Sequence, residues 1–164
     1  MKMVPVSDFT DVEWYHAYHI VYDRETNEVM GTNPSLYVSP PPIVTFYETA
    51  TQRVAQGVLQ AWLFYSVKDI PIGYVLLDKT KGEWELGIAI KDTDERSKGY
   101  GARAALRALK WAFEEEHARW VVAFTQGKDL KVPQMVKRMG FEKLYHFWVM
   151  TPEVWDATWA GRIK

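Results

Sequence analysis

EWELGIAI (residues 83–90), KDTDERSK (91–98) and GYGARAALRALKWAF (99–113) follow one another in the middle of the chain. The first segment is an apolar run with the length of a buried strand, and the second is a polar loop that ends at a glycine. In the third segment apolar residues recur at helical spacing, at Ala102, Ala105, Leu106, Leu109 and Phe113. The stretch therefore predicts a strand, a loop and an amphipathic helix in direct succession.

Two glycines, Gly99 and Gly101, lie at the predicted start of this helix. The first N–H groups of a helix have no partner within the helix, and the positive end of the helix dipole lies there. Phosphate is the anion most often bound at such a position. We therefore expect a phosphate-containing ligand to contact the backbone between the loop and the helix.

Two known phosphate-binding patterns fit these glycines. Gly99-x-Gly101-x-x-Ala104 matches the dinucleotide fingerprint, but that motif has its glycines directly after a strand, within a βαβ unit. Here eight polar residues separate the strand from Gly99, and too few residues follow for a doubly wound domain. The second pattern, Arg/Gln-x-x-Gly-x-Gly/Ala, fits Arg96 to Gly101 with a strand before it and a helix after it.

The second pattern resembles the coenzyme loop of the GNAT family of acyl-CoA-dependent N-acyltransferases. The order of the later segments is similar too: a strand at 120–126, a helix at 132–139, and then Gly140-Phe141-Glu142, which looks like the family's junction before its last strands. The resemblance implies an α+β fold with a mixed, mostly antiparallel central sheet of about six or seven strands, flanked by about four helices.

The N-terminal part predicts two helices. A capping-box pattern at Thr10 and Glu13 starts the first, and Gly31 ends it. Pro42, in a first helical turn, starts the second, which runs through Gln56. In the resembling family this region forms one wall of the acceptor site.

Strand patterns fill most of the remaining chain. Val58–Val67 and Ile70–Asp78 read as the two strands of a hairpin. With residues 83–90 they give three antiparallel strands before the loop, an order that favours an α+β sheet. We expect Met3–Val6 to add a short strand and Phe141–Met150 to add the final strand or hairpin.

The composition is that of one globular domain over residues 1–164, with 48% hydrophobic and 25% charged residues. The resemblance divides this domain into an acceptor side, residues 1–57, and a core with the coenzyme site, residues 58–150. The formal net charge of −1 gives no electrostatic footprint for nucleic acid. The N-terminus lacks the apolar core of a signal peptide, and no apolar run approaches the length of a membrane span, so we expect a cytoplasmic protein.

The residue types exclude sites that need cysteine and give little support for a metal site. The chain has no cysteine, which excludes disulfides, thiolate metal sites and a cysteine nucleophile. His16 and His19 have a spacing that permits metal ligation, but no second motif accompanies them, so no metal site is expected.

The resemblance implies transfer of an acetyl or other short acyl group from acyl-CoA to a primary amine, by direct attack of the amine on the thioester. Acetyl-CoA is then the co-substrate, held by backbone groups of the loop, the helix start and the preceding strand. In the family this strand and the next one splay apart around the acyl-pantetheine, and a backbone N–H near 88–90 binds the oxyanion. The implied coenzyme-binding residues are Ile88, Ala89, Ile90, Arg96, Ser97, Lys98, Gly99, Tyr100, Gly101 and Ala102.

Glu85 is the candidate general base. A primary amine is almost wholly protonated at neutral pH, so the reaction needs a group that removes a proton. By strand alternation Glu85 shares a face with Gly87 and Ala89, which leave room for a substrate. Glu85 precedes Gly99 by fourteen residues, which looks like the spacing of the base glutamate in the family's histone-acetylating branch. The alternatives are a structural carboxylate paired with a cation, or Glu83 as the base.

The general acid departs from the family pattern. Many members carry a tyrosine four residues before the glycine of the "GF" pair and an asparagine eleven residues before it, where this chain has Val136 and Asp129. Tyr145 is the candidate replacement, with His146 beside it, although a coenzyme thiolate can also leave without an acid.

Three functions remain open at this stage. The first is amine acylation. The second is a catalytically degenerate acyl-CoA-binding or protein-interaction module, in which tryptophan-rich ends bind a partner. Separately, the eight tryptophans leave a homodimer open. The third is an acyltransferase that acts on a nucleic-acid base or an aminoacyl group. The sequence does not identify the acceptor.

Overall fold

The computed structural model describes residues 1–91, 93–125 and 131–164. Its strands are β1 Met3–Pro5, β2 Leu59–Tyr65, β3 Pro71–Asp78, β4 Trp84–Ile90, β5 Val121–Ala123, β6 Glu142–Leu144 and β7 Phe147–Met150. Its α-helices are α1 Asp11–Val21, α2 Arg24–Met30, α3 Ile43–Ala55, α4 Tyr100–Lys110, α5 Lys131–Arg138 and α6 Pro152–Thr158. Short helical turns of other types are Val6–Asp8, Pro34–Leu36, Thr93–Glu95 and Trp111–Glu115.

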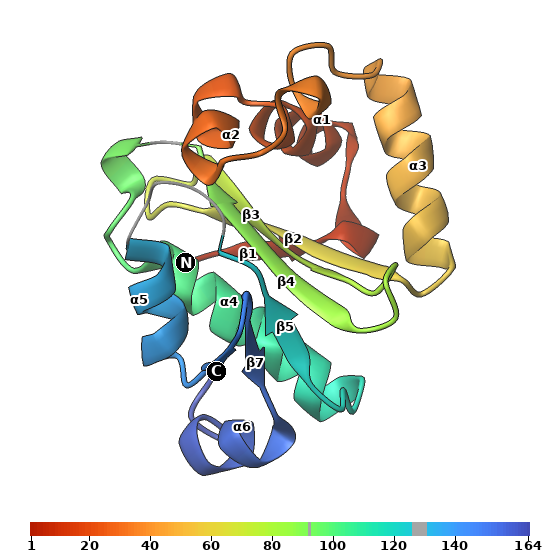
Figure 1. Cartoon of the computed structure of the whole chain (residues 1–164). Coiled ribbons are helices and arrows are strands. Elements are labelled where there is room, and N and C mark those ends of the chain that lie inside the picture. The colour runs from red at the N-terminus through yellow and green to blue at the C-terminus, as the bar shows by residue number, and fades with distance from the viewer. Residues whose placement is uncertain (92, 126–130) are drawn as a thin grey trace.

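The seven strands form one sheet in the order β1-β2-β3-β4-β5-β7-β6 (Figure 1). Neighbouring strands are antiparallel except β4 and β5, which are parallel. The predicted α+β class with a mixed, mostly antiparallel sheet is therefore confirmed. Pro5 is tolerated in β1 because this strand lies at the edge of the sheet.

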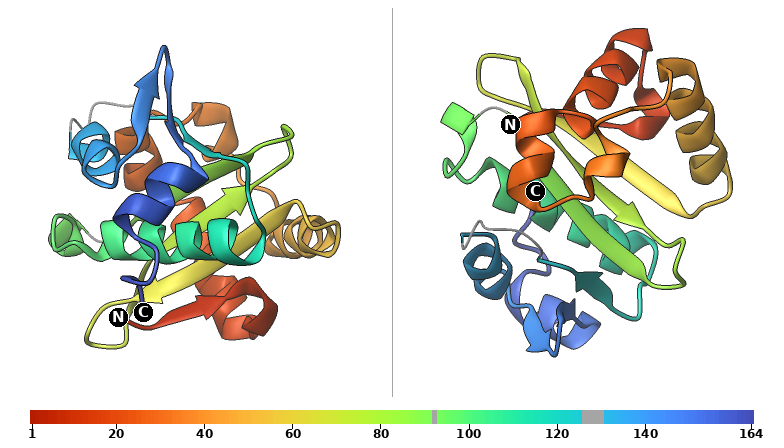
Figure 2. Two further views of the ribbon diagram at one scale, coloured as in Figure 1. Left: turned by 90° about the horizontal axis from the view of Figure 1, so that it is seen from below. Right: turned by 45° about the horizontal axis from the view of Figure 1, so that its top comes forward.

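The sheet has an apolar cluster on each face, as strand alternation requires. In β2, Trp62 and Phe64 belong to one cluster, and Leu63 and Tyr65 belong to the other. Helix α4 packs on the first face, whereas α1, α2 and α3 lie on the other side (Figures 1 and 2). The apolar residues of β4 lie on the α4 side of the sheet, opposite the face of Glu85; they are Trp84, Leu86, Ile88 and Ile90.

The helix predicted from Thr10 to Gly31 is two helices. It begins with the predicted capping box and ends at Gly31, which has a left-handed backbone. In between, the carboxylate of Asp23 accepts a hydrogen bond from the backbone N–H of Thr26 at 2.9 Å and so caps α2. The side-chain amide of Asn27 donates to the backbone oxygens of Val21 and Asp23, both at 2.8 Å. These bonds satisfy backbone groups at the break between α1 and α2. The break itself was not predicted from the sequence.

We expect Asn27→Asp to lower the free energy of unfolding by about 2 kcal/mol. Asn27 is 7% exposed, and a carboxylate of the same shape only accepts hydrogen bonds, so it would face two carbonyl oxygens without a proton between them. Urea denaturation measures the change. The exposed Asn33→Asp is the matched control, because Asn33 uses its side-chain oxygen as an acceptor toward Ser35. Equal stability of the two variants would contradict this role for Asn27.

The aromatic residues of α1 pack mainly against α3. The ring of Phe46 contacts the rings of Trp14, Tyr18 and Tyr22, with centroid distances of 5.7–6.0 Å. Tyr15 points away from this cluster and is 53% exposed. The cluster therefore joins the two long N-terminal helices.

The C-terminal part differs most from the sequence expectation. The predicted strand 120–126 is the short β5, and Gln126 lies outside the described residues. Helix α6 was not predicted, and with the break between α1 and α2 it raises the number of α-helices in the described ranges to six, against about four expected. Trp155 of α6 is fully buried and stacks on Phe113 at 5.6 Å. Trp155 thus belongs to the core, and Trp159 packs against it while partly buried.

None of the helices in the described ranges has the length and hydropathy required to cross a bilayer. The division into residues 1–57 and 58–150 stays a prediction.

Candidate active site

A cleft of about 1060 Å³ lies where β4, α4, α5 and α2 come together. From β4, Glu85 through Ile90 line it, and Gly101, Ala102 and Leu106 of α4 continue the wall. Met135 and Val136 of α5 close the opposite side. The cleft combines an apolar floor with a helix start at one end.

The cleft passes between β4 and β5. In the described part of the chain these strands pair at only two positions, Trp84 with Val121 and Glu85 with Val122. Beyond them β4 continues to Ile90, while the residues after Val122 line the cleft from the other side. The two strands thus separate around the space that the resemblance assigns to the acyl-pantetheine.

The start of α4 opens into this cleft. Gly99 is the N-cap residue, with φ 78° and ψ 5°, and no side chain caps the helix there. A Cβ added at Gly101 would lie 3.4 Å from the Cδ1 of Ile88 and 3.5 Å from that of Ile90, so the first turn of α4 lies against the apolar face of β4. Both glycines line the cleft. The uncapped first turn is a favourable site for a phosphate group.

Arg96 ties the loop to both walls of the cleft. Its Nε donates to the backbone oxygen of Ile90 at 3.0 Å, and its Nη2 donates to the hydroxyl of Thr26 in α2 at 3.4 Å. Burial alone would raise the pKa of Asp23 nearby, but the hydrogen bonds from Thr26 and the positive charges of Lys91 and Arg96 outweigh burial and hold this pKa below its usual value. Arg96 therefore has a structural partner on each side as well as a positive charge at the cleft.

Other cations also lie at this end of the cleft. The Nζ of Lys131 donates to the hydroxyl of Ser97 at 3.1 Å, and the Nζ of Lys98 lies 3.1 Å from the carboxylate of Glu95. Ser97 itself has a positive φ of 67°, which turns the loop toward Gly99. The positive charge and the helix start together favour an anionic ligand.

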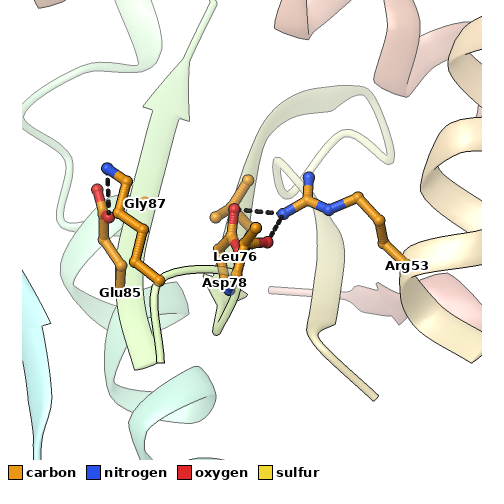
Figure 3. Close-up of a pocket in the computed structure, with 7 residues that line it drawn as sticks. Arg53, Leu76, Asp78, Glu85 and Gly87 are labelled. Atoms are coloured by element: carbon orange, nitrogen blue, oxygen red, sulfur yellow. Dashed lines mark hydrogen bonds and ion pairs between the residues drawn. The ribbon is translucent and has the colours of Figure 1, made fainter. Parts of the chain in front are cut away.

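Glu85 lies at the opposite end, between the large cleft and a second pocket of about 370 Å³ (Figure 3). Its side chain is 32% exposed, and one carboxylate oxygen lies 3.6 Å from the Nζ of Lys81. Because the Lys81 side chain is 82% exposed, this ion pair is weak and does not occupy the carboxylate fully. Gly87 lines the same two spaces and leaves room beside Glu85.

A second carboxylate faces the small pocket. Asp78 of β3 stands opposite Glu85 in the strand register, and its Oδ2 lies 2.5 Å from the Nη2 of Arg53 in α3 (Figure 3). Burial alone would raise the pKa of Asp78, but hydrogen bonds from Arg53 and Thr80 and the charge of Arg53 lower it. The pocket therefore presents two carboxylates, of which Asp78 is the more firmly paired.

A sequence model of the acetyltransferase (GNAT) domain matches residues 5–142. The chain belongs to the GNAT acetyltransferase family. Membership confirms the predicted family and the prediction of a GNAT-type N-acetyltransferase with acetyl-CoA as co-substrate. No curated protein sequence matches the chain significantly.

Solved GNAT structures share the fold at low sequence identity. A spermidine N-acetyltransferase from Vibrio cholerae, in complex with CoA and spermine, has a TM-score of 0.74 and 13% identity over 93% of this chain and 97% of its own. An aminoglycoside acetyltransferase in complex with coenzyme A has a TM-score of 0.72 and 13% identity, covering 96% and 99%. A ribosomal-protein-alanine acetyltransferase from Vibrio fischeri has a TM-score of 0.69 and 14% identity, covering 87% and 91%.

Most of the residues predicted to bind the coenzyme line the GNAT cleft. The lining residues are Ile88, Ala89, Ile90, Arg96, Ser97, Gly99, Gly101 and Ala102. Lys98 and Tyr100 do not line it. The ring of Tyr100 is buried, and its hydroxyl accepts a hydrogen bond from the backbone N–H of Val67 at 3.4 Å, so this side chain belongs to the core.

The candidates for the GNAT general acid are not brought together with Glu85. Tyr145 lies in the turn between β6 and β7, is 90% exposed and does not line the cleft, and His146 beside it is exposed too. For this reason we do not propose Tyr145 as the acid. Val136 lines the cleft as a buried apolar residue, and Asp129 lies outside the described residues.

Sequence reasoning expected the N-terminal helices to form a wall of the acceptor site, but it missed that one of them also borders the coenzyme loop, and it missed one hydroxyl of the GNAT cleft. The bordering segment consists of α2 and the loop after it, including Thr26, Met30 and Asn33. The hydroxyl is that of Thr125, which follows β5 and lines the cleft. Its position within the predicted strand 120–126 was the available signal, because that strand was expected to border the pantetheine.

Proposed function

We propose that the chain transfers an acetyl or other short acyl group from acyl-CoA to a primary amine, by direct attack of the amine on the thioester. The observation that carries this proposal is the cleft between β4 and β5, which joins the uncapped start of α4 at one end to the carboxylate of Glu85 at the other. The two ends of the cleft suit acyl-CoA, which carries phosphate groups at one end and the reactive thioester at the other.

Coenzyme binding uses the N-terminal end of α4. The pyrophosphate accepts hydrogen bonds from the backbone N–H groups between Arg96 and Ala102, and Gly99 and Gly101 let it approach the backbone. The acyl-pantetheine arm lies in the gap between β4 and β5. A backbone N–H near Ile88–Ile90 then stabilises the oxyanion as the thioester carbonyl is attacked.

Glu85 acts as the general base, directly or through one water molecule. Its carboxylate takes a proton from the ammonium form of the acceptor, which leaves the neutral amine that attacks. Because Glu85 also lines the small pocket, the amine reaches it from that side, past Asp78. The two carboxylates of this pocket are matched by the cations Arg53 and Lys81, so its charge selects no acceptor. The neighbouring structures include enzymes named for spermidine and aminoglycoside acetylation, which supports an amine.

Isothermal titration with acetyl-CoA is the first test, because it needs no knowledge of the acceptor. We expect saturable binding, followed by release of free CoA thiol with at least one amine from a panel of spermidine, an aminoglycoside and an alanine-initiated peptide. Binding without thiol release at neutral and alkaline pH would favour the second candidate, a catalytically degenerate module. The absence of the GNAT tyrosine at Val136 favours this alternative. A folded protein that binds neither acetyl-CoA nor longer acyl-CoAs would overturn the proposal.

A further inference from the structure

We propose that Thr125 is a further catalytic residue, whose hydroxyl donates a hydrogen bond to the coenzyme sulfur as the carbon–sulfur bond breaks, and that Trp148 orients this hydroxyl. The inference rests on the proposed acyl transfer and supplies the group that faces the leaving thiolate.

The hydrogen bond between Trp148 and Thr125 fixes the direction of the hydroxyl. The indole Nε1 of Trp148 donates to the Oγ1 of Thr125 at 3.2 Å. An indole N–H only donates, so Thr125 is the acceptor in this bond and its own proton must point elsewhere. Thr125 is half-buried and lines the cleft, so the cleft is the space open to this proton.

Burial and strand pairing fix the position of the Trp148 indole, which orients the Thr125 hydroxyl. It is 8% exposed and belongs to the core cluster on the α4 side of the sheet. Its strand β7 pairs with β5, where Trp148 stands opposite Ala123. The sheet therefore positions the residue that supplies the orienting N–H. Ala123, the partner of Trp148 in β5, precedes Thr125 by two residues.

Thr125 follows the strand on the far side of the gap from β4. The pairing of the parallel strands ends at Glu85 and Val122, β5 ends at Ala123, and Thr125 lines the cleft together with Ile88. Thr125 thus lies across the gap from the backbone that we assign to the oxyanion. In the proposed pose the thioester directs its carbonyl oxygen to β4, meets the amine from the side of Glu85 and places its sulfur toward Thr125.

The cleft offers no hydroxyl at the usual GNAT position. There the chain has Val136, which is 3% exposed and cannot donate a hydrogen bond. Thr125 approaches from β5 instead of α5. A hydrogen bond to a charged group is among the stronger ones in proteins, so one donor aimed at the forming thiolate has a measurable effect.

The proposed step is balanced as follows. Glu85 first passes the proton that it took from the ammonium form to water. The neutral amine nitrogen then forms a bond to the carbonyl carbon, its second proton passes to Glu85, and the carbon–sulfur bond breaks with its electron pair going to sulfur. A threonine hydroxyl does not ionise at neutral pH, so Thr125 keeps its proton and stabilises the thiolate as a hydrogen-bond donor. The thiolate takes a proton from water when the coenzyme leaves.

The pKa of the bound CoA thiol tests this role without any acceptor. The variants are Thr125→Val, which removes the hydroxyl at nearly constant volume, Thr125→Ser, which keeps it, and Trp148→Phe, which removes the orienting N–H. Thiolate is measured by ultraviolet absorbance during a pH titration of each CoA complex, with the desulfo-CoA complex as the blank. We expect the thiol pKa to be higher in Thr125→Val than in the wild type by about one to two pH units, nearly unchanged in Thr125→Ser, and intermediate in Trp148→Phe.

Turnover gives a second measurement once an acceptor is known. Thr125→Val is expected to lower kcat by about ten- to a hundredfold with little change in the KM for acetyl-CoA. Equal binding of desulfo-CoA by all variants shows that they are folded. An unchanged thiol pKa in Thr125→Val with CoA bound would overturn the role of Thr125 alone, whereas absence of CoA binding by the wild type would overturn the proposed function.

Discussion

Glu85→Gln is expected to lower kcat by about a hundred- to ten-thousandfold at neutral pH, with almost no change in the dissociation constant of acetyl-CoA. Glutamine keeps the size of the side chain and its place on β4, but it cannot take a proton from the ammonium form of the acceptor. Steady-state kinetics and calorimetry measure the two quantities separately. Glu83→Gln is the matched control, because Glu83 is exposed and precedes β4.

The pH dependence of Glu85→Gln separates loss of a base from a general disturbance of the site. Without a base, the rate follows the fraction of acceptor that is already neutral, and an alkylamine has an ordinary pKa of about 10.4. The logarithm of kcat/KM should then rise by about one for each pH unit through the neutral and alkaline range. A variant that stays inactive at alkaline pH, or one that is fully active at neutral pH, would contradict the assignment of Glu85 as the base.

Gly99→Asp is expected to weaken acetyl-CoA binding by about ten- to a hundredfold relative to Gly99→Asn. Both side chains have the same shape, and both tolerate the left-handed backbone of Gly99 better than most residues do. A Cβ at this position meets no atom within 4 Å, so neither replacement is crowded. Only the aspartate places a negative charge where the pyrophosphate is expected.

Stability and salt dependence make this comparison decisive. An aspartate at the start of a helix stabilises the helix, so weaker binding by Gly99→Asp could not be attributed to unfolding. Titration calorimetry at two salt concentrations should show the difference between the variants shrink as salt screens the repulsion. Equal affinities of the two variants at low salt would contradict the prediction that the pyrophosphate binds at the start of α4.

The βα unit from β4 to α4 was predictable because its signals are local. Apolar alternation, two glycines and a helical repeat lie within one stretch, and each acts on its own neighbours. The break between α1 and α2 was not predicted, because the sequence marks it only by the polar run of residues 23–28 and it depends on the side chain of Asn27 bonding to backbone oxygens. Helix α6 is short, and it is held by Trp155 packing on Phe113, a contact between distant segments.

The candidate site was partly predictable for the same reason. Glu85 and the glycines follow from strand alternation and a short motif, whereas the wall formed by α2 depends on the hydrogen bond from Arg96 to Thr26, which are seventy residues apart. Tyr145 shows how register limits such reasoning. Apolar and polar residues alternate poorly in the final segment, so the sequence does not show at which residue the hairpin turns. Tyr145 lies in this turn and not on a strand face.

The brief pairing of β4 and β5 divides the hydrogen bonds of the sheet into two sets. Among the described residues, two pairs join the strands β1 to β4 to the strands β5, β7 and β6 within the sheet, and the rest of the connection is packing in the core that both sets share. A pantetheine arm bound in the gap would contact both β4 and the residues after β5, so bound coenzyme would stabilise the two sets of strands against each other. We expect amide hydrogen exchange in β5 and β7 to slow more on addition of CoA than exchange in β2 and β3.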